Sequence, residues 1–144
     1  MRVSTKGRYA LRMMVDLAEH REEGFIALKD IAERQGISKK YLEQIVSVFH
    51  RSNLLRANRG SMGGYMLAKP PSACTVGEIL RLTEGSLDPV ACVDEPAECE
   101  RSADCPTIIV WKGLSKVVND YLDSITLQDI IDKNRERDEF NYII

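Results

Sequence analysis

The chain has 144 residues, 44% of them hydrophobic and 29% charged, which is enough for one domain with a hydrophobic core and too few for two independent domains. No apolar run approaches the roughly 20 residues of a membrane-spanning helix, and the first residues lack a secretory signal, so we expect a soluble cytoplasmic protein with no membrane partner. The net charge of −2 is uneven, because residues 1–69 hold thirteen Lys and Arg against seven Asp and Glu, whereas residues 70–144 hold seven against fifteen.

The first fifty residues predict three helices, with a tight turn between the second and the third. Ser4 or Thr5 can cap the first helix, in which apolar residues recur at helical spacing. A short second helix over residues 28–32 leads to Gly36, because glycine accepts the left-handed backbone that such a turn needs. Ser38 then caps the third helix, so the order is helix, tight turn, helix.

The third helix has one apolar face and one polar face. Apolar side chains follow the spacing of a buried stripe at Leu42, Ile45, Val46 and Phe49. A helix-turn-helix places its second helix in the major groove of DNA, where polar side chains of the first turns reach the base edges. A polar face that only meets solvent is the alternative. The DNA-binding candidates on this helix are Ser38, Lys39, Lys40, Tyr41, Glu43 and Gln44.

Residues 54–67 predict a β-hairpin with a basic, glycine-rich tip. A hairpin directly after a recognition helix is typical of a winged helix, whose wing enters the minor groove with its backbone close to the phosphates. The alternative is an ordinary surface hairpin. The positive charge of residues 1–69 favours DNA, although oppositely charged halves could instead compensate each other across a dimer. The candidates on the wing are Arg59, which we expect to insert, and Gly60, Gly63 and Gly64.

Helices joined by a long loop are predicted for the second half of the chain. Thr75 can cap a helix that ends at Gly85, and residues 89–105 show no periodicity and are expected to form a loop. Pro106 suits the first position of a long helix. A short helix over residues 127–131 then precedes a charged stretch.

The long helix carries an apolar seam that suits a symmetric partner. We therefore predict a mainly α fold with a small β-hairpin, organised as a winged helix-turn-helix plus a long C-terminal dimerisation helix. Residues 1–71 form the DNA-binding domain, and residues 72–144 hold the cysteine loop and the dimerisation helices within one compact protomer. The predicted seam comprises Ile108, Trp111, Leu114, Ser115, Val118, Tyr121, Leu122 and Ile125.

Three cysteines lie in the predicted loop, at Cys92, Cys99 and Cys105. Cysteines in a reducing compartment indicate metal or redox chemistry more than disulfides. Thiolates are the natural ligands of iron-sulfur clusters, whereas structural zinc sites usually contain a closely spaced cysteine pair that this loop lacks. The spacing alone leaves an iron-sulfur cluster, zinc and unligated thiols open. Cys74 lies apart and is expected to be a small buried residue.

Several motifs together resemble the IscR-type family of bacterial iron-sulfur and stress regulators. They run along nearly the whole chain: residues 4–10 (Ser-Thr-Lys-Gly-Arg-Tyr-Ala), Gly36-Ile37-Ser38 with Tyr41-Leu42-Glu43-Gln44, Arg59-Gly60 with Gly63-Gly64-Tyr65, Val76-Gly77-Glu78-Ile79, the three cysteines, Trp111, and Ile125-Thr126-Leu127.

The resemblance implies a homodimeric winged-helix repressor of iron-sulfur cluster biogenesis genes that binds a palindromic operator. It places Ser38, Lys40, Glu43 and Gln44 near major-groove bases and the wing in the minor groove. It also implies that the three loop cysteines hold a [2Fe-2S] cluster, with a larger cluster as the alternative.

This chain departs from the IscR pattern at the fourth cluster ligand. Ile108, which cannot bind metal, stands where the best-matching family member has a histidine. A fourth ligand must then come from a nearby oxygen donor, or from the partner's first helix or recognition helix in a dimer. The nearby donors are Glu98, Glu100, Asp104 and Thr107.

The residues leave two other functions of the same fold open, which are repression in response to nitric oxide and repression of cysteine metabolism. A zinc-stabilised protein-interaction module is a different class. We expect no enzymatic activity, because the sequence has no nucleophile and base pair, no phosphate-binding glycine loop and no carboxylate dyad.

Overall fold

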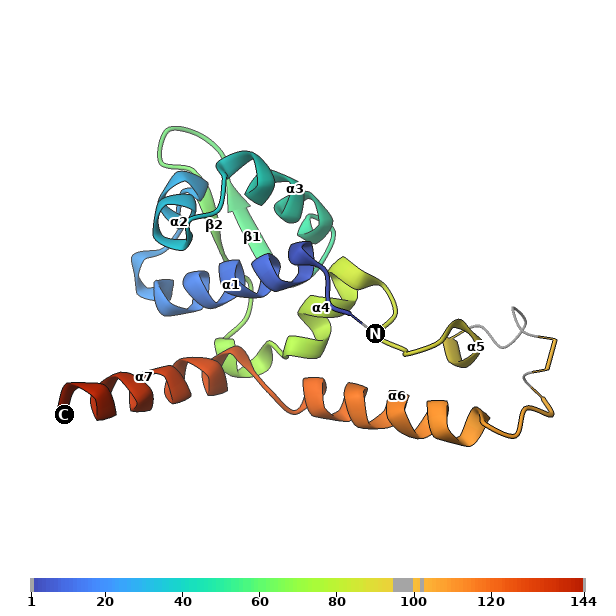
Figure 1. Cartoon of the computed structure of the whole chain (residues 1–144). Helices are drawn as coiled ribbons and strands as arrows, with labels where there is room; N and C mark the ends of the chain where they lie inside the picture. The colour runs from blue at the N-terminus through green and yellow to red at the C-terminus, as the bar shows by residue number, and fades with distance from the viewer. Residues whose placement is uncertain (1, 95–99, 102, 144) are drawn as a thin grey trace.

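The protein is mainly helical, with one small antiparallel hairpin, in a computed structural model that describes residues 2–94, 100–101 and 103–143. This is the winged-helix architecture predicted from the sequence. Figure 1 shows the first four helices and the hairpin packed into one body, with α6 and α7 along one side of it. The elements are α1 (Thr5–Glu19), α2 (Leu28–Gln35), α3 (Lys39–Phe49), β1 (Leu55–Asn58), β2 (Gly64–Leu67), α4 (Val76–Glu84), α5 (Ala91–Asp94), α6 (Ile108–Asp123) and α7 (Leu127–Ile143), with short 3-10 turns at Arg21–Glu23 and Pro71–Ala73.

The helix starts follow the predicted caps. The Ser4 hydroxyl accepts a hydrogen bond from the Gly7 amide at 3.0 Å, and the Ser38 hydroxyl accepts one from the Tyr41 amide at 3.1 Å. Gly36 has the expected left-handed backbone, with φ of 65°, and ends α2. These contacts span three residues or fewer, so the local sequence is enough to specify them.

One hydrophobic core joins both halves of the chain. Side chains of α1 and α3, among them Met13, Leu17 and Phe49, pack with Leu127 and Ile131 of α7. All of them are buried, and burying a large apolar side chain stabilises a fold by about 1.5–3 kcal/mol. The start of α7 is therefore an integral part of the body that carries the recognition helix. Cys74 belongs to the same core and is fully buried, as predicted.

A buried carboxylate fixes α2 against α1. Asp16 is only 1% exposed, and Arg34 donates two hydrogen bonds to it, at 3.0 and 2.7 Å. The Gln35 side-chain amide donates a third at 2.9 Å. A buried charge is tolerable only when it is paired and hydrogen-bonded in this way. This cluster sets the angle between the two helices that precede the recognition helix.

The hairpin is docked along the start of β2, and its tip is exposed. Ile26, in the segment before α2, exchanges two backbone hydrogen bonds of 2.8 Å with Tyr65. A Cβ atom on Gly64 would lie 2.3 Å from the Ile26 carbonyl oxygen, so only glycine allows this approach. Residues 59–62, beyond the strands, are all exposed. The position of the hairpin is therefore set by the contact between the start of β2 and Ile26.

Three predictions for the second half were wrong in detail. Residues 91–94 form a helical turn, α5, inside the predicted loop. Pro106 is not the first residue of the long helix, which begins at Ile108 with Thr107 as N-cap. The last helix does not stop near residue 131 but continues to Ile143, because most of the charged residues that follow are Lys, Arg and Glu, which are good helix formers.

The predicted seam of α6 was also partly wrong. Val118 and Leu122 face the protein's own body, where they pack on a second apolar cluster of Val76, Leu80 and Leu87. The exposed apolar stripe of α6 instead includes residues that the seam omitted. We call this stripe the α6 outer face: Ile109, Val110, Leu114, Val117 and Tyr121.

Candidate nucleic-acid interface and cysteine loop

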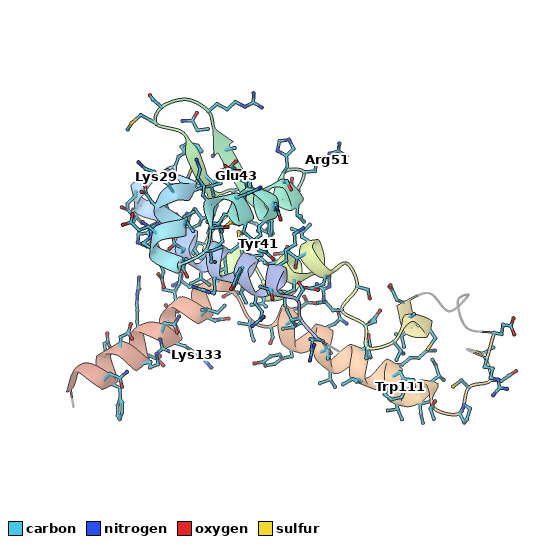
Figure 2. The ribbon with its side chains drawn as sticks, turned by 45° about the horizontal axis from the view of Figure 1, so that its top comes forward. Lys29, Tyr41, Glu43, Arg51, Trp111 and Lys133 are labelled. Carbon is cyan, nitrogen blue, oxygen red and sulfur yellow. The ribbon has the colours of Figure 1, made fainter. Side chains whose placement is uncertain are left out.

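The polar face of α3 is fully available to a partner. All the candidates on this helix except Tyr41 are exposed, while the apolar stripe on the opposite side is buried in the core. Figure 2 shows Glu43 on the side of the molecule that also carries the hairpin, away from Trp111 on α6. The helix therefore presents hydrogen-bonding groups outward from a rigid base.

Two lysines begin the recognition helix, where their charge is unfavourable for the helix itself. Lys39 and Lys40 occupy the first turn of α3, which contains no acidic residue. The N-terminus of a helix carries partial positive charge, so a cation there typically lowers the stability of the helix by about 0.3–1 kcal/mol. Free backbone amides and two ammonium groups together make a binding position for an anion such as a phosphate.

Tyr41, one of the predicted DNA-binding candidates, has a packing role between α3 and α1. Its ring meets the Tyr9 ring edge-on, with centroids 5.6 Å apart, and the Arg12 guanidinium lies 5.4 Å from the centre of the Tyr9 ring. Tyr41 is therefore half-buried between α3 and α1. Its contact braces the start of the recognition helix against α1.

The wing tip combines an exposed cation with a tight glycine-rich turn. Arg59 is exposed, and the neighbouring Met62 is 85% exposed. Gly60 has φ of 114°, which side-chain-bearing residues rarely adopt, and a Cβ on Gly63 would come within 2.8 Å of the Gly60 carbonyl oxygen. The turn itself therefore explains these two glycines, and the packing against Ile26 explains Gly64.

Three further cations lie on the surface, outside the set of predicted DNA-binding candidates. Lys29 at the start of α2, Arg51 just after α3 and Arg56 on β1 are exposed. Figure 2 shows Lys29 and Arg51 on the same side of the molecule as Glu43. The sequence shows only their charge, because the turns between the elements decide which side each residue faces.

Cys92 and Cys105 stand at the two ends of the cysteine loop. Cys92 is in α5, Cys105 lies three residues before α6, and both thiols are free and half-exposed. The hydroxyl of Thr107, 3.3 Å from the sulfur, and the Thr107 amide lower the pKa of the Cys105 thiol. A lowered thiol pKa favours the thiolate, the form that binds metals. Cys99 and Glu98 lie outside the described residues.

The donor chemistry of this loop fits an iron-sulfur cluster, but the described residues do not form a complete site. Within the described ranges, no three His, Cys, Asp or Glu side chains are close enough to hold one metal ion. Ile108 is the first residue of α6. Glu100 and Asp104 are exposed, and the Thr107 hydroxyl is the oxygen donor that lies next to the Cys105 sulfur in the described part of the loop.

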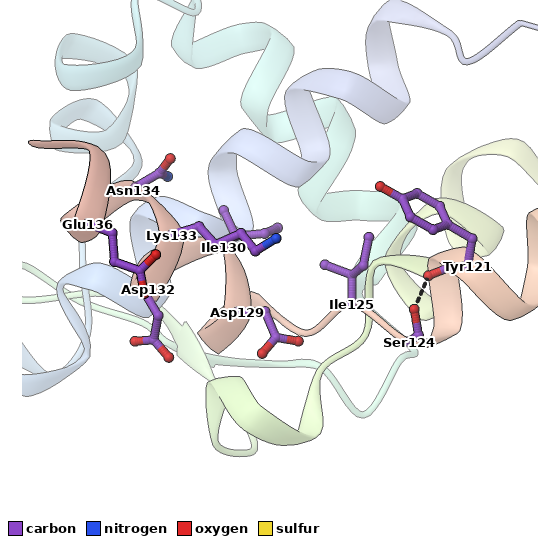
Figure 3. Close-up of a pocket in the computed structure, with 9 residues that line it drawn as sticks. All are labelled: Tyr121, Ser124, Ile125, Asp129, Ile130, Asp132, Lys133, Asn134 and Glu136. Atoms are coloured by element: carbon purple, nitrogen blue, oxygen red, sulfur yellow. Dashed lines mark hydrogen bonds between the residues drawn. The ribbon is translucent and has the colours of Figure 1, made fainter. Parts of the chain in front are cut away.

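A groove of about 610 Å³ separates α6 from α7. Tyr121 of the α6 outer face is one of the residues that line it (Figure 3). The groove is lined by Tyr121, Ser124, Ile125, Asp129, Ile130, Asp132, Lys133, Asn134 and Glu136.

In the parts of the chain that the structure describes, no helix has both the length and the apolar character needed to cross a membrane.

Comparison with known proteins finds similarity along almost the whole chain. Residues 3–133 match the model of the Rrf2 family, described as iron-dependent transcriptional regulators. The HTH-type transcriptional regulator IscR of Erwinia tasmaniensis is 40% identical over 131 residues, which cover 91% of this chain and 79% of the relative.

Two solved structures share both fold and sequence with the chain. T. potens IscR has a TM-score of 0.77 and 41% identity, covering 95% of this chain and 90% of its own. CymR, the global cysteine regulator of B. subtilis, has a TM-score of 0.73 and 39% identity, covering 90% and 95%. The chain therefore belongs to the Rrf2 family and is an IscR-like transcriptional regulator, not an enzyme.

Proposed function

We propose that this regulator is a homodimeric repressor whose affinity for a palindromic operator depends on an iron-sulfur cluster held by Cys92, Cys99 and Cys105. One observation carries the proposal. The cysteine loop connects α4, which packs on the first helix of the DNA-binding body, with α6, which carries an unpartnered apolar face.

In this proposal α3 lies in the major groove and reads bases by direct hydrogen bonds. Lys40 suits a guanine edge, Gln44 an adenine edge and Glu43 a cytosine amino group. Ser38 lies near the bases, and Lys39 contacts the DNA backbone at the start of the helix, where the free amides favour phosphate. Arg59 enters the minor groove from the wing.

Lys29, Arg51 and Arg56 complete the proposed interface as phosphate contacts. Such contacts position a protein on the duplex without reading sequence. Each phosphate neutralised adds to the salt dependence of binding, with a slope of about −0.9 in log affinity per contact. We therefore expect these three cations to set the general affinity and α3 to set the sequence preference.

A second copy of the chain is the proposed occupant of the α6 outer face. The exposed apolar side chains of this face, with Val117 65% and Tyr121 63% exposed, lie on one long helix. Apolar residues along one side of such a helix suit a symmetric contact, in which the same face meets itself. Two protomers joined in this way would present two recognition helices about 34 Å apart, one turn of DNA.

Cluster binding is proposed to order the loop. When bound, the cluster supplies redox-active iron whose loss or oxidation changes how the loop is held. Cys92, Cys99 and Cys105 would hold it as thiolates, and Glu100, Asp104, Thr107 or a side chain of the second protomer would complete the ligand set. Because ligation draws together residues that are separate in the chain, it restricts the segment between α4 and α6.

The test is purification without oxygen, followed by a visible spectrum and by iron and sulfide quantitation. We expect a coloured protein with iron and acid-labile sulfide, and promoter DNA that binds differently before and after cluster removal. Cys92→Ala should lose the iron, whereas Cys74→Ala, which removes the buried thiol outside the loop, should keep it. A colourless, iron-free protein that ignores DNA at low salt would overturn the proposal.

A second candidate is a cluster-independent regulator of cysteine metabolism. The similarity to CymR is nearly as high as the similarity to IscR. Iron-free protein that still binds a promoter tightly would favour this candidate. One zinc per chain without visible absorption would instead favour the zinc-stabilised module.

A further inference from the structure

A hydrogen bond joins the beginning of the cysteine loop to the middle of α6. The Ser115 hydroxyl donates to a carboxylate oxygen of Asp88, 27 residues earlier in the chain. Ser115 is 8% exposed, and Asp16 is the other buried polar side chain among the described residues. Asp88 lies four residues before Cys92. A buried hydroxyl on an otherwise apolar helix face is therefore used to hold the start of the loop.

The bond continues into a network that reaches α4. The Asn119 amide donates to the Ser115 carbonyl at 2.8 Å, and Arg81 of α4 donates to the Asn119 side-chain oxygen at 2.7 Å. Arg81 also makes two hydrogen bonds to Asp123, at 2.7 and 2.9 Å. Asp88, α6 and α4 are thus linked through consecutive hydrogen bonds.

The residues just before Asp88 are also fixed by contacts with neighbouring elements. Leu87 is buried in the second apolar cluster, between α4 and α6. Glu84, the last residue of α4, accepts hydrogen bonds from the amide and hydroxyl of Ser4, at 3.1 and 2.5 Å. Ser4 is the N-cap of α1. A displacement of residues 84–88 would therefore act directly on the start of the DNA-binding body.

We propose that Asp88 and Ser115 are positioning residues that transmit the state of the cysteine loop to the DNA-binding body. The proposal rests on the proposed function. With the three cysteines ligated, the segments from Asp88 to Cys92 and from Cys105 to Ser115 form a closed ring. The cluster joins them at the cysteines, and the hydrogen bond joins them at Asp88 and Ser115. The loop can then change the position of α6 relative to α4. Without the Asp88–Ser115 bond the ring is open, and ligation can be absorbed by the loop itself.

Coupling of this kind has a defined signature. Two sites are coupled when ligation of one changes the affinity of the other, and the ratio of the two affinities measures the coupling. A hydrogen bond that merely packs the loop would change stability but leave this ratio intact. The ratio of promoter affinities with and without the cluster is therefore the quantity to measure.

The experiment compares anaerobically purified full-length wild type with Asp88→Ala and Ser115→Ala, each assayed loaded and after cluster removal by a chelator. We expect normal iron and sulfide content in both variants, and an affinity ratio that falls at least fivefold toward one. The double variant should behave like either single variant, because both remove the same bond. Asp88→Asn keeps an oxygen for the Ser115 hydroxyl and should retain most of the ratio.

Asp120→Ala is the matched control. It removes one carboxylate from the same helix, from an exposed pair with Lys116, and should leave the ratio unchanged. If wild type shows a ratio and both variants keep it, the coupling role is refuted and the proposed function stands. Loss of iron from both variants also refutes it, because the bond would then serve loop assembly. A wild-type ratio of one refutes the proposed function, and the coupling with it.

Discussion

Arg34 donates two hydrogen bonds to the buried carboxylate of Asp16, which lies eighteen residues earlier in the chain. This pair fixes the two helices that carry α3, so it links the stability of the body to the position of the recognition helix. Nothing local specifies it. It forms because α1 and α2 cross at this point.

Arg34→Ala should lower the free energy of unfolding by about 2 kcal/mol, because it leaves a buried carboxylate without its charged partner. Urea denaturation followed by circular dichroism measures this. Arg137→Ala removes an exposed pair of 3.9 Å and should cost less than about 0.5 kcal/mol. Equal losses in the two variants would show that the Asp16 contact is not structural.

Gly64→Ala should destabilise the protein by about 1–3 kcal/mol, because its Cβ would overlap the backbone of Ile26, which cannot rotate away. Gly113, on α6, is the matched control, since a Cβ there meets nothing within 4 Å. Gly113→Ala should be neutral or stabilise by up to about 1 kcal/mol. Thermal unfolding of both variants gives the comparison, and a tolerated Gly64→Ala would mean that the start of β2 is not packed on Ile26 as described.

Asp123→Asn should produce a pH-dependent loss of stability. The hydrogen bonds from Arg81 lower the pKa of Asp123 below its ordinary value of 3.8. The ionised carboxylate therefore stabilises the fold above that value, and its contribution is lost as the pH falls below it through the folded-state pKa. The stability difference between wild type and variant should be constant at about pH 5–7 and shrink at lower pH.

The same measurement in an Arg81→Gln background provides the control for Asp123. Without the guanidinium, the pKa of Asp123 should return toward its ordinary value, and the pH-dependent part of the difference should disappear. Persistence of that part would assign the effect to another carboxylate.

Val117→Glu should convert the proposed dimer to a folded monomer. Val117 is 65% exposed, so the charge enters the α6 outer face without disturbing the core. Sedimentation equilibrium should give half the wild-type mass with unchanged helix content. Lys112→Glu reverses an exposed charge on the same helix and should leave the mass unchanged. A dimeric Val117→Glu would place the interface elsewhere.

Arg59→Ala should weaken binding to a promoter fragment by about 1–3 kcal/mol. The loss follows from removing the one arginine at the wing tip, residues 59–62. Fluorescence anisotropy at fixed salt measures it, with Arg135→Ala on α7 as a control for loss of one exposed positive charge. Equal affinity of Arg59→Ala and wild type would place the wing outside the groove.

Most of the DNA-binding half was predictable because its signals are local. Ser4 and Ser38 cap their helices through hydrogen bonds from amides three residues away, and Gly36 ends α2 in the conformation that glycine favours. Such contacts depend on a few neighbouring residues and survive in almost any tertiary setting. The buried stripe of α3 was equally accessible, because only one of its faces is apolar.

The long helix α6 was harder because it has apolar residues on two faces. Its periodicity indicates a helix but cannot say which face meets the protein's own body. Val118 and Leu122 pack inward, and Val117, which the predicted seam omitted, points outward. The charged stretch after residue 131 was similarly ambiguous, since charged residues suit both a long helix and an irregular tail.

The sequence by itself determined the class of fold, the helix caps, the amphipathic third helix and the hairpin, because each of these depends on residues close together in the chain. Only the tertiary structure decided which distant groups meet: Arg34 with Asp16, Gly64 with Ile26, and Ser115 with Asp88. Those pairs depend on how helices cross and how loops return. That is fixed by the burial of the whole core, and no short segment of sequence specifies it.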